Sequence, residues 1–310
     1  MDGVLVVDKA RGMTSHDVVS RLRRACGQRR IGHAGTLDPA ATGILVVALG
    51  EATKLVPYLM AEEKVYDAVI HFGAETDTLD ACGEVVERGP EEIALERREV
   101  EQVLASFQGR IEQEPPRVSA IRVGGMRAHA KVRRGDDFEM PTRTVDLYAS
   151  ELKAFCPRGL ALRIVCGKGF YVRSLARDLS RRLGTVGHLA RLRRRRVGRF
   201  SLASALPYSC IEGAISGDQA AQARLQGALL PIEAAAGHLP AVQLSDTGAE
   251  DAQQGRPVLA PGCLSGQLPE LPDDEVALLF SPNGKALALA KRVGQGLRIV
   301  RGFRHSAPEA

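Results

Sequence analysis

The stretch GHAGTLDPAATG, residues 32–43, places a single carboxylate, Asp38, in a loop rich in glycine, alanine and threonine. Glycine-rich loops often bind phosphate, but this one lacks the G-x-x-x-x-G-K-[ST] pattern, and its aspartate would repel a phosphate. An isolated Asp-Pro pair most simply predicts a turn, because aspartate initiates turns and proline presets the backbone that follows. Whether Asp38 has a chemical role therefore depends on the sequence around it.

The segments on both sides of this loop predict a mixture of strands and helices. Strands are expected at GVLVVDK, GILVVAL, KVYDAVIHFG, TRTVDLYASELKAF and LALRIVCGKGFYV. Helices are expected at TSHDVVSRLRRACG, with Thr14 and Asp17 as a capping box, and at EATKLVPYLM, EVEQVLASFQG and VRSLARDLSRRLG. Residues 115–134 predict a strand, a glycine turn and a basic helix. Because strands and helices do not alternate regularly, we expect an α+β fold.

The amino-acid composition of the chain changes near residue 235. Residues 211–237 are rich in alanine and glutamine and predict helices, whereas short apolar runs follow from 238 onward. The sequence PNGK between two of these runs predicts a β-hairpin. We therefore expect a large domain over residues 1–235, a small β-rich domain over 236–305 and a frayed tail over 306–310.

Positive charge is concentrated in the first two thirds of the chain. The formal net charge is +5; residues 211–310 hold 8 Lys+Arg and 11 Asp+Glu, which leaves 34 and 26, a net of +8, for residues 1–210. Six arginines lie within residues 191–199, and such a run is either a solvated face or a strip that binds phosphates. A polyanion partner is therefore expected for the larger domain.

Composition also excludes several classes of protein. No apolar run approaches the ~18 residues of a membrane-spanning helix, and the N-terminus has no signal-peptide pattern. The six cysteines are scattered without a C-x-x-C pair, so neither zinc nor redox chemistry is expected. We expect a cytoplasmic protein with reduced thiols and no membrane association.

A series of motifs in fixed order resembles one family. They are D-K-x-x-G-x-T-S at 8–15, G-H-x-G-T-L-D-P-x-A-T-G at 32–43, E-A-T-K at 51–54, K-x-Y at 64–66, T-D-T-x-D at 76–80, S-A-I at 119–121, K-G-x-Y-V-R at 168–173 and L-R-R at 192–194. Over about residues 3–200 the chain thus resembles the TruB-type tRNA pseudouridine synthases, which isomerise uridine 55 in the T-loop of tRNA. The C-terminal segment resembles, more loosely, their PUA-type RNA-binding domain. Departures from the family pattern occur at Ala10, His129 and Phe170, where proline, tyrosine and threonine are usual.

The resemblance implies a fold and a set of site residues. The fold would be a mixed, mainly antiparallel sheet flanked by helices, followed by a small PUA-like domain. Asp38 would be the catalytic residue, supported by Arg173 through an ion pair and by Lys64. Substrate-binding residues would be His33, Tyr66, Tyr171 and Leu192. The RNA backbone would be contacted by Arg191, Arg193, Arg194, Arg195 and Arg196.

The reaction itself needs few chemical groups. Pseudouridine formation breaks the N1–C1′ bond, rotates the uracil and rejoins it through C5, so we expect no cofactor and no metal. Asp38 would act as a nucleophile at C6 or C1′, or as a base at C2′, on a base flipped out of the RNA. Asp77 and Asp80 are expected only to organise a loop.

The expected partner is the T-arm of tRNA, bound by a monomer without an obligatory protein partner. The alternatives are a pseudouridine synthase for another RNA and a non-catalytic RNA-binding or remodelling protein. An NTP-binding protein is disfavoured because its phosphate-binding motif is missing.

Overall fold

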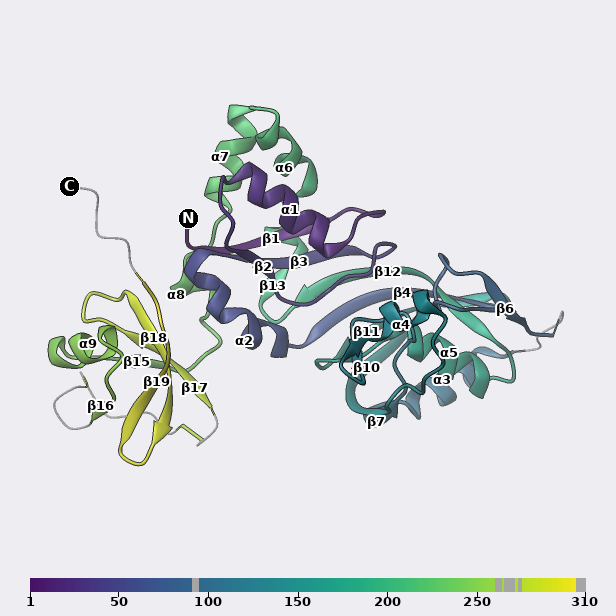
Figure 1. The fold of residues 1–310 in the computed structure, drawn as a ribbon. Coiled ribbons are helices and arrows are strands. Elements are labelled where there is room, and N and C mark those ends of the chain that lie inside the picture. The colour runs from purple at the N-terminus through teal and green to yellow at the C-terminus, as the bar shows by residue number, and fades with distance from the viewer. Residues whose placement is uncertain (91–94, 260–263, 265–270, 273–274, 305–310) are drawn as a thin grey trace.

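The computed structural model describes residues 1–90, 95–259, 264, 271–272 and 275–304. Its larger part is built on a ten-stranded sheet, and a separate five-stranded sheet forms the C-terminal part (Figure 1). The main path of the large sheet runs β14 (Leu206–Pro207), β1 (Gly3–Lys9), β3 (Thr42–Leu49), β12 (Gly187–Val197), β4 (Lys64–Phe72), β11 (Gly159–Cys166), β10 (Arg143–Cys156), β7 (Gly109–Gln113). Two further strands, β2 (Ile31–His33) and β13 (Phe200–Ser201), pair with β3 and β12.

Most neighbours in this sheet are antiparallel, and the exceptions lie at β1–β14 and β3–β12. The expected mixed, mainly antiparallel α+β fold is therefore confirmed. The β3–β12 pairing is short, since it joins only Thr42 to Arg193 and Gly43 to Arg194. Beyond these two pairs β12 leaves β3, and the loop carrying Asp38 lies at the resulting opening.

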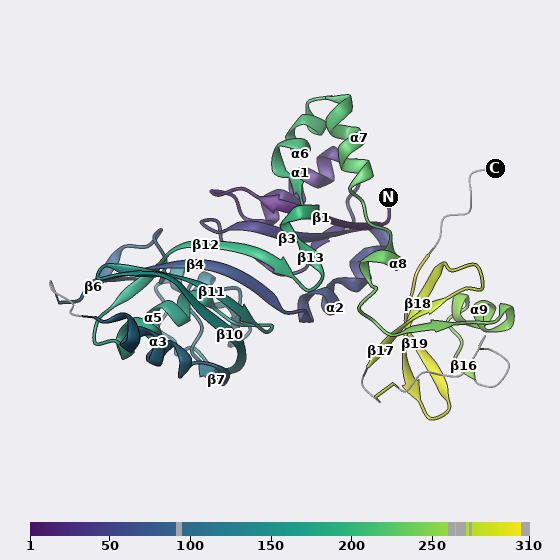
Figure 2. The same ribbon diagram turned by 180° about the vertical axis from the view of Figure 1, so that it is seen from behind.

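Helices cover the two halves of the large sheet separately (Figures 1 and 2). The helix α1 (Ser15–Ala25), with the expected Thr14–Asp17 capping box, packs with α6 (Tyr208–Ile215) and α7 (Gln219–Gly227) over the N-terminal half. The helices α3 (Arg97–Ala105) and α5 (Val172–Arg182) pack on the other half, where Leu162, Ile164 and Leu175 are fully or almost fully buried. Both halves are thus anchored by their own apolar core.

The shorter elements refine the sequence-based expectations. The segment EATKLVPYLM is a 3-10 helix η1 (Gly50–Leu55) followed by α2 (Val56–Ala61), so Pro57 lies in the first turn of a helix and not within or at the end of a longer one. The segment 115–134 contains the expected glycine turn, between β8 (Arg122–Val123) and β9 (Met126–Arg127), and the basic helix α4 (Ala128–Arg134). A small hairpin, β5 (Ala74–Thr76) and β6 (Val85–Arg88), follows β4.

The C-terminal sheet has the order β15 (Ala241–Gln243), β17 (Val276–Phe280), β18 (Ala286–Val293), β19 (Gly296–Gly302), β16 (Val258–Leu259). The helix α9 (Asp246–Gln253) packs on it, and the PNGK turn joins β17 to β18 as expected. The boundary proposed near residue 235 falls between the short helix α8 (Ile232–Ala235) and β15, whereas the tail 306–310 lies outside the described residues. None of the helices in the described ranges has the length and apolar character needed to span a bilayer.

A buried carboxylate, Glu51, joins the two parts of the molecule. Its side chain is 8% exposed and forms ion pairs with Arg30 and Lys54. It also accepts a hydrogen bond of 2.7 Å from the backbone N–H of Arg304, which follows β19. Lys54 lies over the ring of Phe303 and donates to the carbonyl of Gly302. This carboxylate and its cations therefore attach the C-terminal sheet to η1, beside the apolar cluster in which Ala52 and Leu55 of η1 are buried with Leu278 and Leu289.

Replacing Glu51 by glutamine should loosen this junction. Burial alone would raise the pKa of Glu51, but the hydrogen bonds from Arg304 and Lys54 and the charges of Lys54 and Arg30 outweigh it and lower the pKa. A carboxylate with a lowered pKa stabilises the fold above its unfolded pKa, and that stabilisation is lost as the pH falls through the folded value. We expect Glu51→Gln to cost about 1–3 kcal/mol at neutral pH, as measured by urea unfolding.

The pH dependence separates this effect from a packing defect. The difference between Glu51→Gln and wild type should shrink as the pH is lowered below the ordinary glutamate pKa of about 4.3. Glu101, which is 50% exposed and paired with Arg97, supplies the control, and Glu101→Gln should change stability by less than about 0.5 kcal/mol. A loss for Glu51→Gln that stays constant between neutral and acid pH would contradict a role for the charge.

Candidate active site

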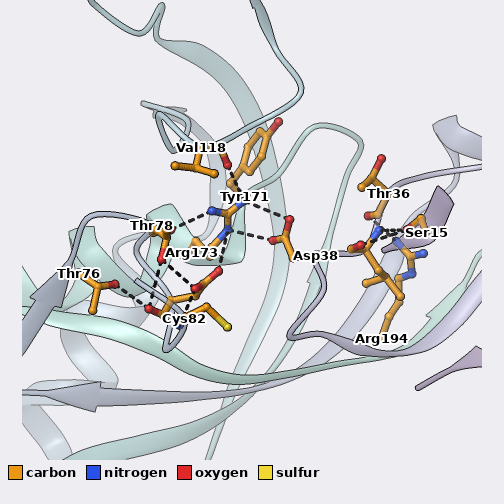
Figure 3. A network of polar contacts seen from close by, with 12 residues as sticks. Ser15, Thr36, Asp38, Thr76, Thr78, Cys82, Val118, Tyr171, Arg173 and Arg194 are labelled. Carbon is orange, nitrogen blue, oxygen red and sulfur yellow. Dashed lines mark hydrogen bonds and ion pairs between the residues drawn. The ribbon is translucent and has the colours of Figure 1, made fainter. Parts of the chain in front are cut away.

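The carboxylate of Asp38 is paired with the guanidinium of Arg173 at the start of α5 (Figure 3). Arg173 Nε lies 2.9 Å from Asp38 Oδ2, and Arg173 Nη2 donates to Asp38 Oδ1 at 3.2 Å. The remaining donors of Arg173 reach the carbonyls of Thr78 and Val118 at 2.8 and 3.1 Å. The arginine side chain is 5% exposed, whereas that of Asp38 is 36% exposed. Asp38 is therefore half-buried, and its outer part is open to a ligand.

A second carboxylate, Asp80, lies on the same arginine. Asp80 Oδ2 is 3.9 Å from Arg173 Nε, and its side chain is 12% exposed. Its other oxygen accepts hydrogen bonds from Thr78 Oγ1 and the backbone N–H of Cys82, at 2.8 and 2.9 Å. Asp80 thus organises its loop as expected, and it also joins the Arg173 network, which the sequence analysis missed. Asp77 accepts from the N–H of Glu84 and has only the loop-organising role.

The backbone of the Asp38 loop is fixed at every carbonyl from residue 35 to residue 39. The hydroxyl of Ser15 donates to the carbonyl of Leu37 and accepts from its N–H, at 3.0 and 2.8 Å. The carbonyl of Asp38 accepts from Ala41, and that of Pro39 from Gly12 and from the ammonium of Lys9. Arg194 supplies donors to the carbonyls of residues 35 and 36. The loop therefore presents Asp38 from a rigid frame.

Lys9 belongs to this frame and carries a buried charge. It is 0% exposed, and its ammonium donates to the carbonyls of Ala10 and Met13 at 3.0 and 2.8 Å. Burial lowers the pKa of Lys9 to about 8, although the charge of Asp38 acts in the opposite direction. Lys9 was not among the residues predicted for the site, and its D-K-x-x-G motif was the available signal.

Three residues predicted to bind the base lie around Asp38. A narrow cleft is lined by Asp38, Ala40, Ala41, Asp80 and residues 189–192, and Leu192 is one of its walls. Tyr171 lies two residues before Arg173. The side chain of Gln113 accepts from the backbone N–H of Tyr171 at 2.8 Å and donates to the carbonyl of Tyr171 at 3.0 Å. Tyr66 is 8% exposed and belongs to the core cluster that includes Leu37 and Ala41. Burial raises the pKa of both tyrosines, so their hydroxyls are protonated at neutral pH.

The other two predicted residues, His33 and Lys64, have surroundings unlike those of Tyr66, Tyr171 and Leu192. His33, at the end of β2, is half-buried, and its Nδ1 is a buried atom without a hydrogen-bond partner. Burial, together with the charge of Arg194, lowers the pKa of His33. Lys64 is 6% exposed and donates to the carbonyls of Met60 and Glu62. Its ammonium is thus engaged by the turn before β4 and not by Asp38.

A larger, basic cavity adjoins the cleft. Its volume is about 560 Å³, and it shares Ala40, Arg191 and Leu192 with the cleft. Its basic lining residues are Arg11, Lys153, Arg163, Arg191 and Arg193. Val69, Ala161 and Leu162 add an apolar surface. Strong positive charge beside an apolar surface suits a ligand that combines phosphates with bases.

The cations of this cavity are not equally available. Asp67 binds Arg163 through both oxygens, at 2.7 and 3.1 Å, and Arg195 lies 3.5 Å from it. Arg193 pairs with Asp8 at 2.8 Å, and Arg196 pairs with Glu63. Arg11 and Arg191 are exposed, and neither forms an ion pair with any residue that the structure describes. Arg11 was not predicted from sequence, because a single arginine between Ala10 and Gly12 carries no motif.

The prediction that Arg194 contacts the RNA backbone is wrong. Arg194 is 1% exposed and is among the largest fully buried side chains in the described structure. On β12 its neighbours Arg193 and Arg195 project to the accessible face, whereas Arg194 points to the interior, because side chains alternate along a strand. A run of arginines conceals this alternation when only the sequence is considered.

The three departures from the family pattern lie beside the network and not within it. Ala10 is exposed, and Phe170 packs at the edge of the core under α5. His129 Nδ1 lies 2.9 Å from the carbonyl of Ser119 at the start of α4. In the described ranges, no three His, Cys, Asp or Glu side chains come together as a metal site.

Comparisons with known proteins agree with this architecture. The model of the TruB family pseudouridylate synthase N-terminal domain matches residues 23–172, and that of the tRNA pseudouridylate synthase B C-terminal domain matches residues 173–236. The tRNA pseudouridine synthase B of Caulobacter vibrioides is 42% identical over 98% of this chain and 96% of that protein. That of Thermobifida fusca is 41% identical, over 96% of this chain and 98% of that protein.

A solved structure shows the same fold at lower sequence identity. The crystal structure of a Cbf5-Nop10-Gar1 complex contains a chain that superimposes with a TM-score of 0.74 and 24% identity. The match covers 97% of this chain and 85% of that chain. Because the identity is low, this similarity concerns the fold alone.

Proposed function

Because the chain belongs to the TruB family of pseudouridylate synthases, we propose that it isomerises uridine 55 in the T-loop of tRNA. The chain is an isomerase that forms pseudouridine in tRNA, as its relatives are named. The observation that carries the proposed site is the half-exposed carboxylate of Asp38, held on a buried arginine at a narrow cleft. Such a carboxylate has a fixed direction and one open side.

In the proposed reaction Asp38 acts directly on the flipped-out nucleotide. The N1–C1′ bond breaks, the uracil turns, and a C5–C1′ bond forms; C5 then loses its hydrogen as a proton while N1 takes up a proton from solvent, so atoms and charge balance. Tyr66, Tyr171 and Leu192 would surround the uracil: Leu192 lines the cleft, Tyr66 packs in the cluster that contains Leu37 and Ala41, and Tyr171 lies two residues before Arg173. His33 would contact the RNA from the end of β2. Lys64 would support the site only indirectly, through the turn before β4.

RNA would lie along the basic cavity and extend to the C-terminal part. Although residues 211–310 are acidic overall, six of their eight cations fall within residues 285–304, which contain no Asp or Glu: Lys285, Lys291, Arg292, Arg298, Arg301 and Arg304. This basic hairpin of β18 and β19 supports an RNA-binding, PUA-like role for residues 236–305. We propose a monomer in the cytoplasm with tRNA as its partner.

Arg11 and Arg191 should contribute most to phosphate binding. Each phosphate neutralised contributes about 0.7–0.9 to the slope of log affinity against log salt. The double variant Arg11→Gln/Arg191→Gln should therefore bind a T-arm stem-loop more weakly, with a slope shallower by about 1.5. Filter binding over a series of KCl concentrations measures it.

A matched pair of arginines controls for net charge. Arg97 and Arg98 are exposed on α3, away from the cavity, and Arg97→Gln/Arg98→Gln removes the same charge. This control should retain the wild-type slope. Equal slopes for the two double variants would mean that the cavity does not bind phosphates.

Tritium release tests the function itself. The substrate is a T-arm stem-loop labelled at C5 of its uridines, since forming the C5 bond must expel that hydrogen. Release from this RNA, and none from a stem-loop with cytidine at position 55, supports the proposal. Release that persists with cytidine 55 would place the reaction at another uridine. No release from an RNA that binds would favour another RNA substrate or a non-catalytic binder.

A further inference from the structure

We propose that Arg194 is a positioning residue that fixes the Asp38 loop against Tyr66, so that turnover depends on it although it does not touch RNA. The inference deepens the proposed function and rests on it, because it concerns the same site. Three hydrogen bonds to backbone carbonyls carry it, together with the pairing of Arg194 with the buried Tyr66 across the sheet.

The contacts of Arg194 connect elements that are distant in sequence. Its Nε donates to the carbonyl of Ile44 at 2.6 Å, and Nη2 donates to that of Gly35 at 3.0 Å. Nη1 reaches the carbonyl of Thr36 at 3.5 Å. The guanidinium also acts on the hydroxyl of Tyr66, the residue paired with Arg194 on β4. In Figure 3 the side chain lies beside Ser15 and Thr36, at the base of the loop that carries Asp38.

The backbone of Arg194 occupies the point where the two halves of the large sheet meet. It pairs with Gly43 on β3 and with Tyr66 on β4. Gly43 has a φ of 99°, and a Cβ placed there would lie 2.2 Å from the carbonyl oxygen of Arg194. Only glycine allows this approach. The backbone of Arg194 thus lies between β3 and Tyr66 on β4, and its side chain reaches the carbonyls of the Asp38 loop.

The chemistry of the guanidinium explains why an arginine is used. It is a planar group with donors in a rigid fork, so it can bind several carbonyls in fixed directions. A lysine ammonium has three donors on one atom and cannot span the same set. No carboxylate pairs with Arg194 in the described part of the chain, so backbone carbonyls solvate its charge. A buried cation is costly, and such an arrangement suits a residue that orients a site more than one that stabilises a fold.

Two variants test the proposal. Arg194→Met keeps an unbranched chain without donors, and Arg194→Lys keeps the charge without the fork. The assay is single-turnover tritium release at saturating enzyme, which separates the rate constant from the fraction of competent protein. A misplacement of about 1 Å costs about 100-fold in rate, so the rate constant of Arg194→Met should fall by about 30- to 100-fold. Arg194→Lys should lose about 10-fold, and its result suffices if the methionine variant does not fold.

Binding measurements distinguish positioning from the other roles. Both variants should bind the stem-loop within about twofold of wild type and keep its salt dependence, because no phosphate contact is lost. Arg191→Gln, on the accessible face of the same strand, should weaken binding and flatten the salt slope. An unchanged rate constant, a shallower slope as in Arg191→Gln, or a loss confined to the reaction amplitude would each overturn the proposal. No release by wild type would instead refute the proposed function.

Discussion

Asp38→Asn should eliminate turnover while leaving RNA binding close to wild type. The amide has the shape of the carboxylate, and its oxygen can still accept one of the two hydrogen bonds from Arg173, so the loop should keep its conformation. It can neither attack carbon nor accept a proton, and loss of such a group typically costs at least ~10⁴-fold in rate. Tritium release from the labelled stem-loop measures the rate, and filter binding measures the affinity. Asp38→Ala should behave in the same way.

A second aspartate provides a close control. Asp178 on α5 is 29% exposed and pairs with Arg177 at 2.7 Å, in a setting much like that of Asp38. Asp178→Asn should retain the wild-type rate within about twofold, since surface changes away from a site have small effects. If Asp38→Asn loses both binding and turnover, Asp38 is structural. If it retains measurable turnover, the reaction depends on another group.

Arg173→Met should cause the second-largest loss. Removal of one fixed donor to a reacting group typically costs about 10²–10³-fold in rate, and we expect a fall of that size in the single-turnover rate constant. Arg173→Lys should recover part of it, because one charged donor can reach Asp38 but not the carbonyls of Thr78 and Val118 as well.

The same substitution should reduce stability. It leaves Asp38 and Asp80 as neighbouring carboxylates without their cation. Breaking a buried pair costs about 3–5 kcal/mol; because the side chain of Asp38 is 36% exposed, solvent screening reduces the expected cost to about 1–3 kcal/mol. Urea unfolding measures this cost. Arg182→Met, at the exposed end of the same helix, should leave the rate unchanged within about twofold. A similar rate loss in both variants would show that α5 contributes through its packing alone.

Local signals in the sequence predicted much of the fold. The capping box of Thr14 and Asp17 and the PNGK turn depend on neighbouring residues, and the structure confirms both. The apolar runs of β1 and β3 were also recognisable, because their side chains are buried on both faces of the sheet. Interactions within a few residues are readable when tertiary contacts do not override them.

The contacts between the site residues were harder to predict from local signals in the sequence. Asp80 and Arg173 are 93 positions apart, and no local pattern shows that α5 brings them to within 3.9 Å. The strand β12 was not assigned, because the inward position that should be apolar carries Arg194. Lys64 lies in a family motif, yet the structure binds its ammonium to local carbonyls. Asp80, Arg173 and Arg194 thus have partners that only the tertiary structure supplies, whereas Lys64 is bound by the turn that precedes it.

The frame of the Asp38 loop ties activity to folding of the whole larger domain. Its donors come from Lys9 at the end of β1, Ser15 at the start of α1 and Arg194 on β12. These segments span most of that domain in sequence, and the one local hydrogen bond described above, from Ala41 to the carbonyl of Asp38, fixes only one turn of the loop. A partly folded chain, with β3 formed but β12 unpaired, would leave the loop unconstrained. Catalytic competence should therefore appear in a single cooperative step with closure of the large sheet, and a nascent chain should stay inactive until residue 194 has been synthesised and paired.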